Sequence, residues 1–217
     1  MEPVVAERLL LINKPLGWTS FDVVNKLRYK LKIKKIGHAG TLDPLATGLL
    51  IICTGKMTKR IDEFQAQEKE YTGKFVLGQT TPSFDLETEV SEPRDISFIN
   101  DEAIHSAAKK FIGTIQQIPP IHSAIRINGK RAYAMARKGK EPELKAREIF
   151  IKEFEITKIE KPAVEFRVVC SKGTYIRSLA RDFGEALGTV AYLSVLCRTR
   201  IGEFKLTNAL SLDQVPE

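Results

Sequence analysis

Asp43 lies in the segment of the chain that is best suited to chemistry. The sequence from Gly37 to Leu50 reads GHAGTLDPLATGLL. Glycines before the aspartate let a ligand approach the backbone closely, and Pro44 biases Asp43 toward an extended conformation that presents its carboxylate at a fixed place. An aspartate before a proline in a glycine-rich loop also commonly caps a turn. The loop by itself therefore leaves a catalytic and a capping role open for Asp43.

A second candidate segment, residues 170–177, reads CSKGTYIR and runs from a predicted strand into a predicted helix. Arg177 falls in the first turn of that helix, where the helix dipole opposes a positive charge. A carboxylate or phosphate partner would account for an arginine at this place. The alternative is an exposed arginine whose stem covers Tyr175. Arg177 is thus a candidate for holding an anion in a functional site.

Short apolar runs and alternating residues predict the strands that position these segments. The run at 49–53 is continuous and predicts a buried strand directly after the Asp43 loop, and three further segments have the length or the alternation of strands. The Asn128-Gly129 pair between residues 125–127 and 130–131 predicts a tight hairpin turn. The predicted strands cover residues 9–12, 49–53, 71–77 and 164–170.

Helical spacing of apolar residues, together with capping residues, predicts the helices. Thr19-Ser20 precedes the first of them, Asn100 begins the third and Gly113 can end it, and Thr174 and Gly188 bound the last. Residues 81–97 are polar and contain two prolines, so we predict a surface loop and not a domain linker. The predicted helices cover residues 21–27, 56–67, 100–113, 133–138 and 176–187.

These elements predict an α+β fold with a mixed, mainly antiparallel sheet flanked by helices and loops, because strands and helices alternate without a regular βαβ rhythm. The chain has 217 residues, of which 43% are hydrophobic, enough for a sizeable core. Its net charge of +7 makes nucleic acid the leading class of partner, although many proteins carry a modest positive excess.

The cysteines and histidines do not have the spacing of a metal site. Each of the three cysteines lies in or beside an apolar stretch, as free thiols do in a reducing compartment, and no pair has the short spacing of zinc ligands. The N-terminus lacks the basic-then-apolar order of a signal peptide, and no apolar run reaches the length of a membrane span. We therefore expect a cytoplasmic protein without a bound metal.

The two candidate segments together resemble motifs of the TruB family of tRNA pseudouridine synthases. A GTLDPLATGLL loop followed much later by KGTYIR, in this order, is far more specific than either motif alone. The segment 13–20, NKPLGWTS, resembles the first motif of the family. Further similarity lies at 117–124, at 129–139, and at Leu196 and Arg198, so the resemblance covers nearly the whole chain.

The resemblance implies the pseudouridine synthase fold and an isomerisation of uridine in RNA without a cofactor or metal. It implies that Asp43 is the essential carboxylate, acting at the ribose as nucleophile or base, and that Arg177 pairs with it. Tyr71 would stack on the displaced base, with its hydroxyl near C5. Lys59 would contact phosphate or support the pocket, and Leu196 would pack against the target base.

The remaining candidate residues would bind the RNA. His38 resembles the family histidine that occupies the space left by the flipped base, and Lys14 and Thr41 lie in the first and second motifs. A basic segment around Tyr133 would hold phosphates, with binding that weakens in salt; a solvated basic helix is the alternative. That segment contains Lys130, Arg131, Arg137, Lys138 and Lys140.

The usual target implied by the resemblance is uridine 55 in the T loop of tRNA, which must be flipped out of its loop. We expect one catalytic domain over residues 1–217, acting as a monomer without a protein partner. The usual C-terminal, PUA-like RNA-binding domain is expected to be missing, in a naturally short form or a trimmed chain. The alternatives are an RNA-folding protein without catalysis and a pseudouridine synthase for another RNA.

Overall fold

The computed structural model describes residues 7–121, 126–127, 130–131 and 144–216. The chain forms two compact units, Met1–Thr72 with Val195–Glu217, and Gly73–Ser194. Strands β4 (Lys69–Leu77) and β10 (Ala191–Ile201) each contribute residues to both units. The expectation of one catalytic domain stays a prediction.

The first unit is organised around the central strand β3 (Ala46–Thr54). β3 pairs antiparallel with β1 (Leu9–Lys14) and with β2 (Ile36–His38), and parallel with residues 196–198 of β10. The short β11 (Phe204–Lys205) is antiparallel to the end of β10. The mixed, mainly antiparallel sheet that the sequence predicted is confirmed here.

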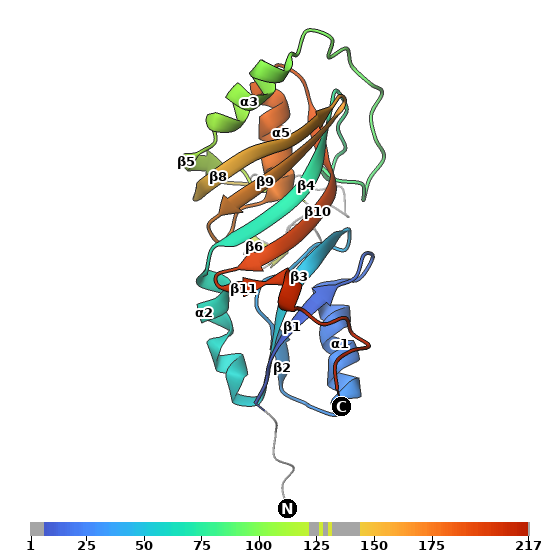
Figure 1. The fold of residues 1–217 in the computed structure, drawn as a ribbon, viewed down its shortest axis with the longest axis vertical. Helices are drawn as coiled ribbons and strands as arrows, with labels where there is room; N and C mark the ends of the chain where they lie inside the picture. Colours follow the sequence, from blue (N-terminus) through green and yellow to red (C-terminus); the bar gives the residue numbers. More distant parts are fainter. Residues whose placement is uncertain (1–6, 122–125, 128–129, 132–143, 217) are drawn as a thin grey trace, which may run out of the picture. The chain divides into compact units, whose positions relative to one another are not determined.

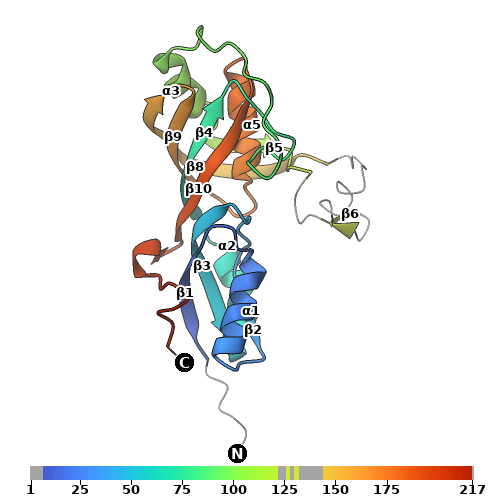
Figure 2. The same ribbon diagram turned by 90° about the vertical axis from the view of Figure 1, so that its right-hand side faces the viewer.

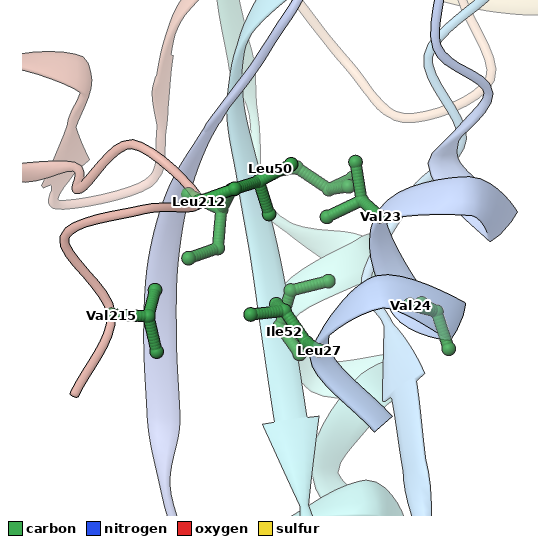
Figure 3. Packing of buried hydrophobic residues seen from close by; sticks show 8 residues of the cluster. Val23, Val24, Leu27, Leu50, Ile52, Leu212 and Val215 are labelled. Atoms are coloured by element: carbon green, nitrogen blue, oxygen red, sulfur yellow. The ribbon is translucent and has the colours of Figure 1, made fainter. Parts of the chain in front are cut away.

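Both faces of β3 are covered, which explains its continuous apolar sequence. On one face Leu50 and Ile52 pack against helix α1 (Ser20–Lys30) and against the C-terminal segment (Figure 3). On the other face Leu49, Ile51 and Cys53 pack against Phe64 of α2 (Ile61–Ala66). The strand therefore anchors the Asp43 loop, which precedes it, in two apolar layers.

Helix α1 begins with a capping box in which Thr19 accepts a hydrogen bond from the Asp22 amide and the Asp22 carboxylate accepts one from the Thr19 amide. Its buried residues are Ser20, Val23, Val24 and Leu27, and it lies against the sheet of its unit (Figure 2). The predicted helix at 21–27 is confirmed, and Phe21, although apolar, is 60% exposed on its solvent side.

The helix predicted at 56–67 has two parts. Residues Gly55–Arg60 form a 3₁₀ helix, and the α-helical turns of α2 begin only at Ile61. Apolar periodicity does not separate the two helix types over so short a segment.

In the second unit, residues 73–77 of β4 are followed across the sheet by β9 (Ala163–Cys170), β8 (Arg147–Glu160) and β5 (Gly113–Gln117) (Figure 1). β8 pairs antiparallel with both β9 and β5. Phe75 stacks on Phe166, and Phe154 and Phe183 meet the same aromatic cluster. Helix α3 (Asp101–Lys109) contacts β8 and helix α5 (Ile176–Ala186).

Two helix boundaries in this unit differ from the prediction. Asn100 does cap α3 through the Ala103 amide, but α3 ends at Lys109, and Gly113 instead begins β5. The N-cap of α5 is Tyr175, without a side-chain cap, and the Thr174 hydroxyl donates to the Ser171 carbonyl. Gly113 and Thr174, which were predicted to end one helix and cap another, instead belong to a strand and to a turn.

The predicted hairpin is present as β6 (Arg126–Ile127) paired antiparallel with β7 (Lys130–Arg131); its turn and the predicted helix at 133–138 lie outside the described residues. The loop predicted at 81–97 contains no helix or strand, as expected, yet Thr81, Ser83 and Asp85 are buried. In the described part of the chain, no helix is long and apolar enough to cross a membrane.

Candidate active site

Asp43 lies, partly exposed, in a turn that leads directly into β3. The carbonyl of Asp43 accepts a hydrogen bond from the Ala46 amide, 3.1 Å away, which closes the turn. Gly40 has a φ of +95°, a conformation that favours glycine. These contacts define the backbone of the turn, and the fixed direction of the Asp43 carboxylate stays a prediction.

The segment 13–20 holds this turn from one side. Ser20 accepts a hydrogen bond from the Leu42 amide at 2.9 Å, and its hydroxyl donates to the Leu42 carbonyl. The Gly17 amide and the Lys14 ammonium both donate to the Pro44 carbonyl, at 2.9 and 3.2 Å. The residues before and after Asp43 are thus tied to the end of β1 and the start of α1.

Arg198 holds the turn from the other side. This side chain is 1% exposed, and its guanidinium donates to the carbonyls of Leu49 and Gly40, at 2.8 and 3.1 Å. The sequence had associated Arg198 with the family motifs but assigned it no role. The family resemblance at this position was the available signal, and the burial of the side chain, whose charge needs acceptors, appears only in the structure.

Two positive charges therefore lie in the surroundings of Asp43. Burial lowers the pKa of Lys14 to about 8, Asp43 acts against this shift, and Arg198 adds to it. Burial, and next Arg198, lower the pKa of His38, so its imidazole is neutral at pH 7. The attraction between Lys14 and Asp43 therefore opposes the effect of burial on Lys14.

Arg177 is held in the second unit by a residue that the sequence prediction missed. Its side chain is 4% exposed and forms an ion pair with Asp85 at 3.4 Å, and it also donates to the Ser83 carbonyl at 3.2 Å. Asp85 in turn accepts hydrogen bonds from the Ser83 hydroxyl and the Glu87 amide. The expected anionic partner exists, whereas the predicted pairing of Arg177 with Asp43 stays a prediction.

Leu196 lies beside the Asp43 turn, because it pairs in register with Ala46 across β10 and β3. Tyr71 is only 8% exposed on β4. Lys59 is exposed in the 3₁₀ helix, and Thr41 is exposed in the Asp43 turn. His38 ends β2, opposite Ile52. Their roles toward RNA stay predictions.

The predicted basic segment falls on the undescribed part of the chain. The side chains of Lys130, Arg131, Arg137, Lys138 and Lys140, and that of Tyr133, lie outside the described residues. Among the residues that are described, no group of three or more His, Cys, Asp and Glu side chains could hold a metal ion.

The comparisons with known proteins agree with the resemblance that the motifs indicated. The family model described as TruB family pseudouridylate synthase (N terminal domain) matches residues 28–176. A tRNA pseudouridine synthase B of Parabacteroides distasonis is 56% identical over 219 residues, covering 98% of this chain and 93% of that protein. The protein of the same name from Flavobacterium johnsoniae is 55% identical over 218 residues, covering 97% and 95%.

A similar chain of known structure occurs in the "Crystal Structure of a Cbf5-Nop10-Gar1 Complex", with a TM-score of 0.74 and 32% identity. The match covers 94% of this chain and 52% of that one, so this chain spans about half its length. A match over more than half the chain and relatives above 50% identity leave one assignment. This chain is a member of the TruB family of pseudouridylate synthases.

Proposed function

We propose that this protein isomerises uridine to pseudouridine in tRNA, at position 55 of the T loop. The names of its relatives, tRNA pseudouridine synthase B, support the substrate class. The structural observation that carries the proposal is the Asp43 turn, which is fixed through its backbone by Lys14, Ser20 and Arg198. A turn that is restrained in this way limits the positions that its carboxylate can take, which favours reaction at a single ribose carbon.

In this reaction the N1–C1′ bond breaks, the uracil turns, and C5 bonds to C1′. The proton on C5 leaves, and N1 ends with a proton, so the product is an isomer of the substrate. Asp43 acts in the first half of the reaction, as nucleophile or as base at the ribose. The neighbouring Lys14, whose pKa is raised by the charge of Asp43 against the effect of burial, supplies positive charge beside the carboxylate.

Tyr71 and Arg177 have roles in the same proposal. Tyr71 would stack on the displaced uracil and assist removal of the C5 proton. Arg177, oriented by Asp85, would supply positive charge to Asp43 during the reaction. Leu196, beside the Asp43 turn, would cover one face of the flipped base.

RNA binding must offset the few kcal/mol that flipping a stacked base costs. The neutral imidazole of His38 can replace stacking inside the emptied loop, and Lys14, Thr41 and Lys59 lie on the same unit as Asp43. Lys130 and Arg137 would bind phosphates. We expect the protein to act as a monomer in the cytoplasm, without a protein partner.

Tritium release from tRNA transcripts labelled at C5 of uridine tests this function. The wild-type protein should release tritium, Asp43→Asn should reduce release at least a thousandfold, as loss of a catalytic group does, and RNA affinity should change less than about threefold. A transcript with cytidine at position 55 should release none. Binding without release would favour an RNA-folding role, and release that persists without uridine 55 would place the reaction at another uridine.

A further inference from the structure

Helix α1 has a solvent face that the proposed reaction does not use. Its buried residues contact β3, and the residues opposite them recur at helical spacing. We call this face the α1 surface; its residues are Phe21, Asn25, Arg28, Tyr29 and Lys32. Figure 3 shows Val23 and Leu27 on the side of α1 that faces Leu50 and Ile52 of β3.

Two exposed aromatic rings lie on the α1 surface. Tyr29 is 89% exposed and Phe21 is 60% exposed, although each could have been a small polar residue at no cost to the core. The Arg28 guanidinium lies 6.0 Å from the centre of the Phe21 ring and donates to the Asn25 side chain at 2.6 Å. Arg28 is therefore partly ordered before any ligand arrives.

The same surface is hollowed. Asn25, Arg28, Tyr29 and Lys32 line a depression of about 450 Å³. That volume is sufficient for one planar base between an aromatic ring and cationic side chains. An exposed tyrosine beside two cations is the arrangement with which proteins stack unpaired bases.

The charge around the depression is strongly positive. Residues 20–35 contain six lysines and arginines and one carboxylate, Asp22. Asp22 is used in the capping box, and Lys30 donates to the carbonyls of Leu212 and Asp213. The side chains of Lys26, Lys32, Lys34 and Lys35 are exposed. A polyanion is the partner that this charge fits.

The α1 surface continues along the chain toward the candidate active site. Lys35 directly precedes β2, and the three steps of extended chain from Lys35 to His38 span roughly 10 Å. His38 is followed within five residues by Asp43. Lys35 is therefore close in the chain to the residue that we expect to enter the RNA loop.

We propose that the α1 surface is a second RNA-binding site, in which Arg28, Lys32 and the neighbouring lysines bind phosphates and Tyr29 stacks on an unpaired base. This proposal rests on the proposed function, which identifies the RNA as the tRNA substrate. The site would hold the RNA beside the catalytic loop and would contribute affinity and not chemistry.

Binding is best measured with Asp43→Asn protein, so that no turnover occurs, and a full-length tRNA transcript at several salt concentrations. Each lost phosphate contact reduces the slope of log affinity against log salt by roughly 0.7–0.9. Arg28→Gln/Lys32→Gln should therefore reduce the slope by roughly 1.5. Lys109→Gln/Lys110→Gln removes the same charge from an exposed site on the other unit, and its slope should equal that of the parent protein.

Tyr29→Ala should weaken binding roughly fivefold or more, because stacking on one base is lost, whereas Tyr29→Phe should bind like the parent protein. Both variants should keep the parent's thermal unfolding midpoint, since the ring is exposed. Equal slopes for the two double variants, or an unchanged affinity for Tyr29→Ala, would overturn the site. A Tyr29→Ala variant that changes self-association but not RNA binding would also overturn the site. Tritium release by wild-type protein tests the reaction separately, so either proposal can fail alone.

Discussion

In one unit of this protein, two buried cations hold the Asp43 turn through backbone carbonyls; in the other, a buried carboxylate holds Arg177 by a direct ion pair. The carbonyl contacts of Lys14 and Arg198 do not cancel their charges, so the turn lies in a positive environment. The Arg177–Asp85 pair is nearly neutral and fixes an orientation instead. The contacts of Lys14 and Arg198 favour an anion near the Asp43 turn. The Arg177–Asp85 pair holds one guanidinium in a defined position.

We expect the greatest loss of stability from a variant that breaks the Arg177–Asp85 ion pair. Asp85→Ala should lower the free energy of unfolding by about 3–5 kcal/mol, because it leaves the Arg177 charge buried without its carboxylate. Urea denaturation measures this. Asp95→Ala in the same loop, where the carboxylate is exposed and caps the Ser97 amide, should leave the midpoint nearly unchanged. Equal effects for the two variants would mean that the Arg177–Asp85 pair does not stabilise its unit.

A smaller loss of stability is expected where the backbones of β3 and β10 approach closely at Gly48. Gly48 has a φ of +100°, and an added Cβ would lie 2.4 Å from the Arg198 carbonyl oxygen, so Gly48→Ala must push β3 and β10 apart. We expect a loss of about 3 kcal/mol. Gly17→Ala has a similar φ, +80°, but open space around the new Cβ, and should lose only about 1 kcal/mol. Thermal unfolding that ranks the two variants equally would contradict the close approach at Gly48.

The smallest change in stability is expected from the pH dependence of the buried Lys14. The pKa of Lys14 is about 8 in the folded protein and 10.5 when unfolded, so the unfolded chain binds more protons between these values. The contribution of Lys14 to stability should thus rise with pH, by about 2 kcal/mol between pH 7.5 and 10. Urea denaturation of wild type and Lys14→Met at both pH values isolates this group. A constant difference between the two proteins would show that burial does not lower the pKa of Lys14.

Regular elements were predicted well where a local pattern had one physical meaning. The apolar run 49–53, the capping signal at Thr19 and the alternation at 164–170 all became the expected elements. The long strands β8 and β10 were not predicted. The short β2 and β5 were missed as well, and each of these two contains a glycine. Their strand conformation depends on hydrogen bonds to β3 and β8, distant partners that no local pattern contains.

The family, the α+β class and the candidate residue Asp43 could be predicted from the residues alone, because glycine and proline restrict the backbone locally and the two motifs occur in a specific order. The side chains that support Asp43 and Arg177 could be identified only once the chain was seen folded. Lys14 and Arg198 lie in or near the family motifs but far from Asp43 along the chain, and Asp85 lies in a loop that was predicted to be at the surface. Their roles arise from burial, because a charge without water must find carbonyl or carboxylate partners that folding brings to it.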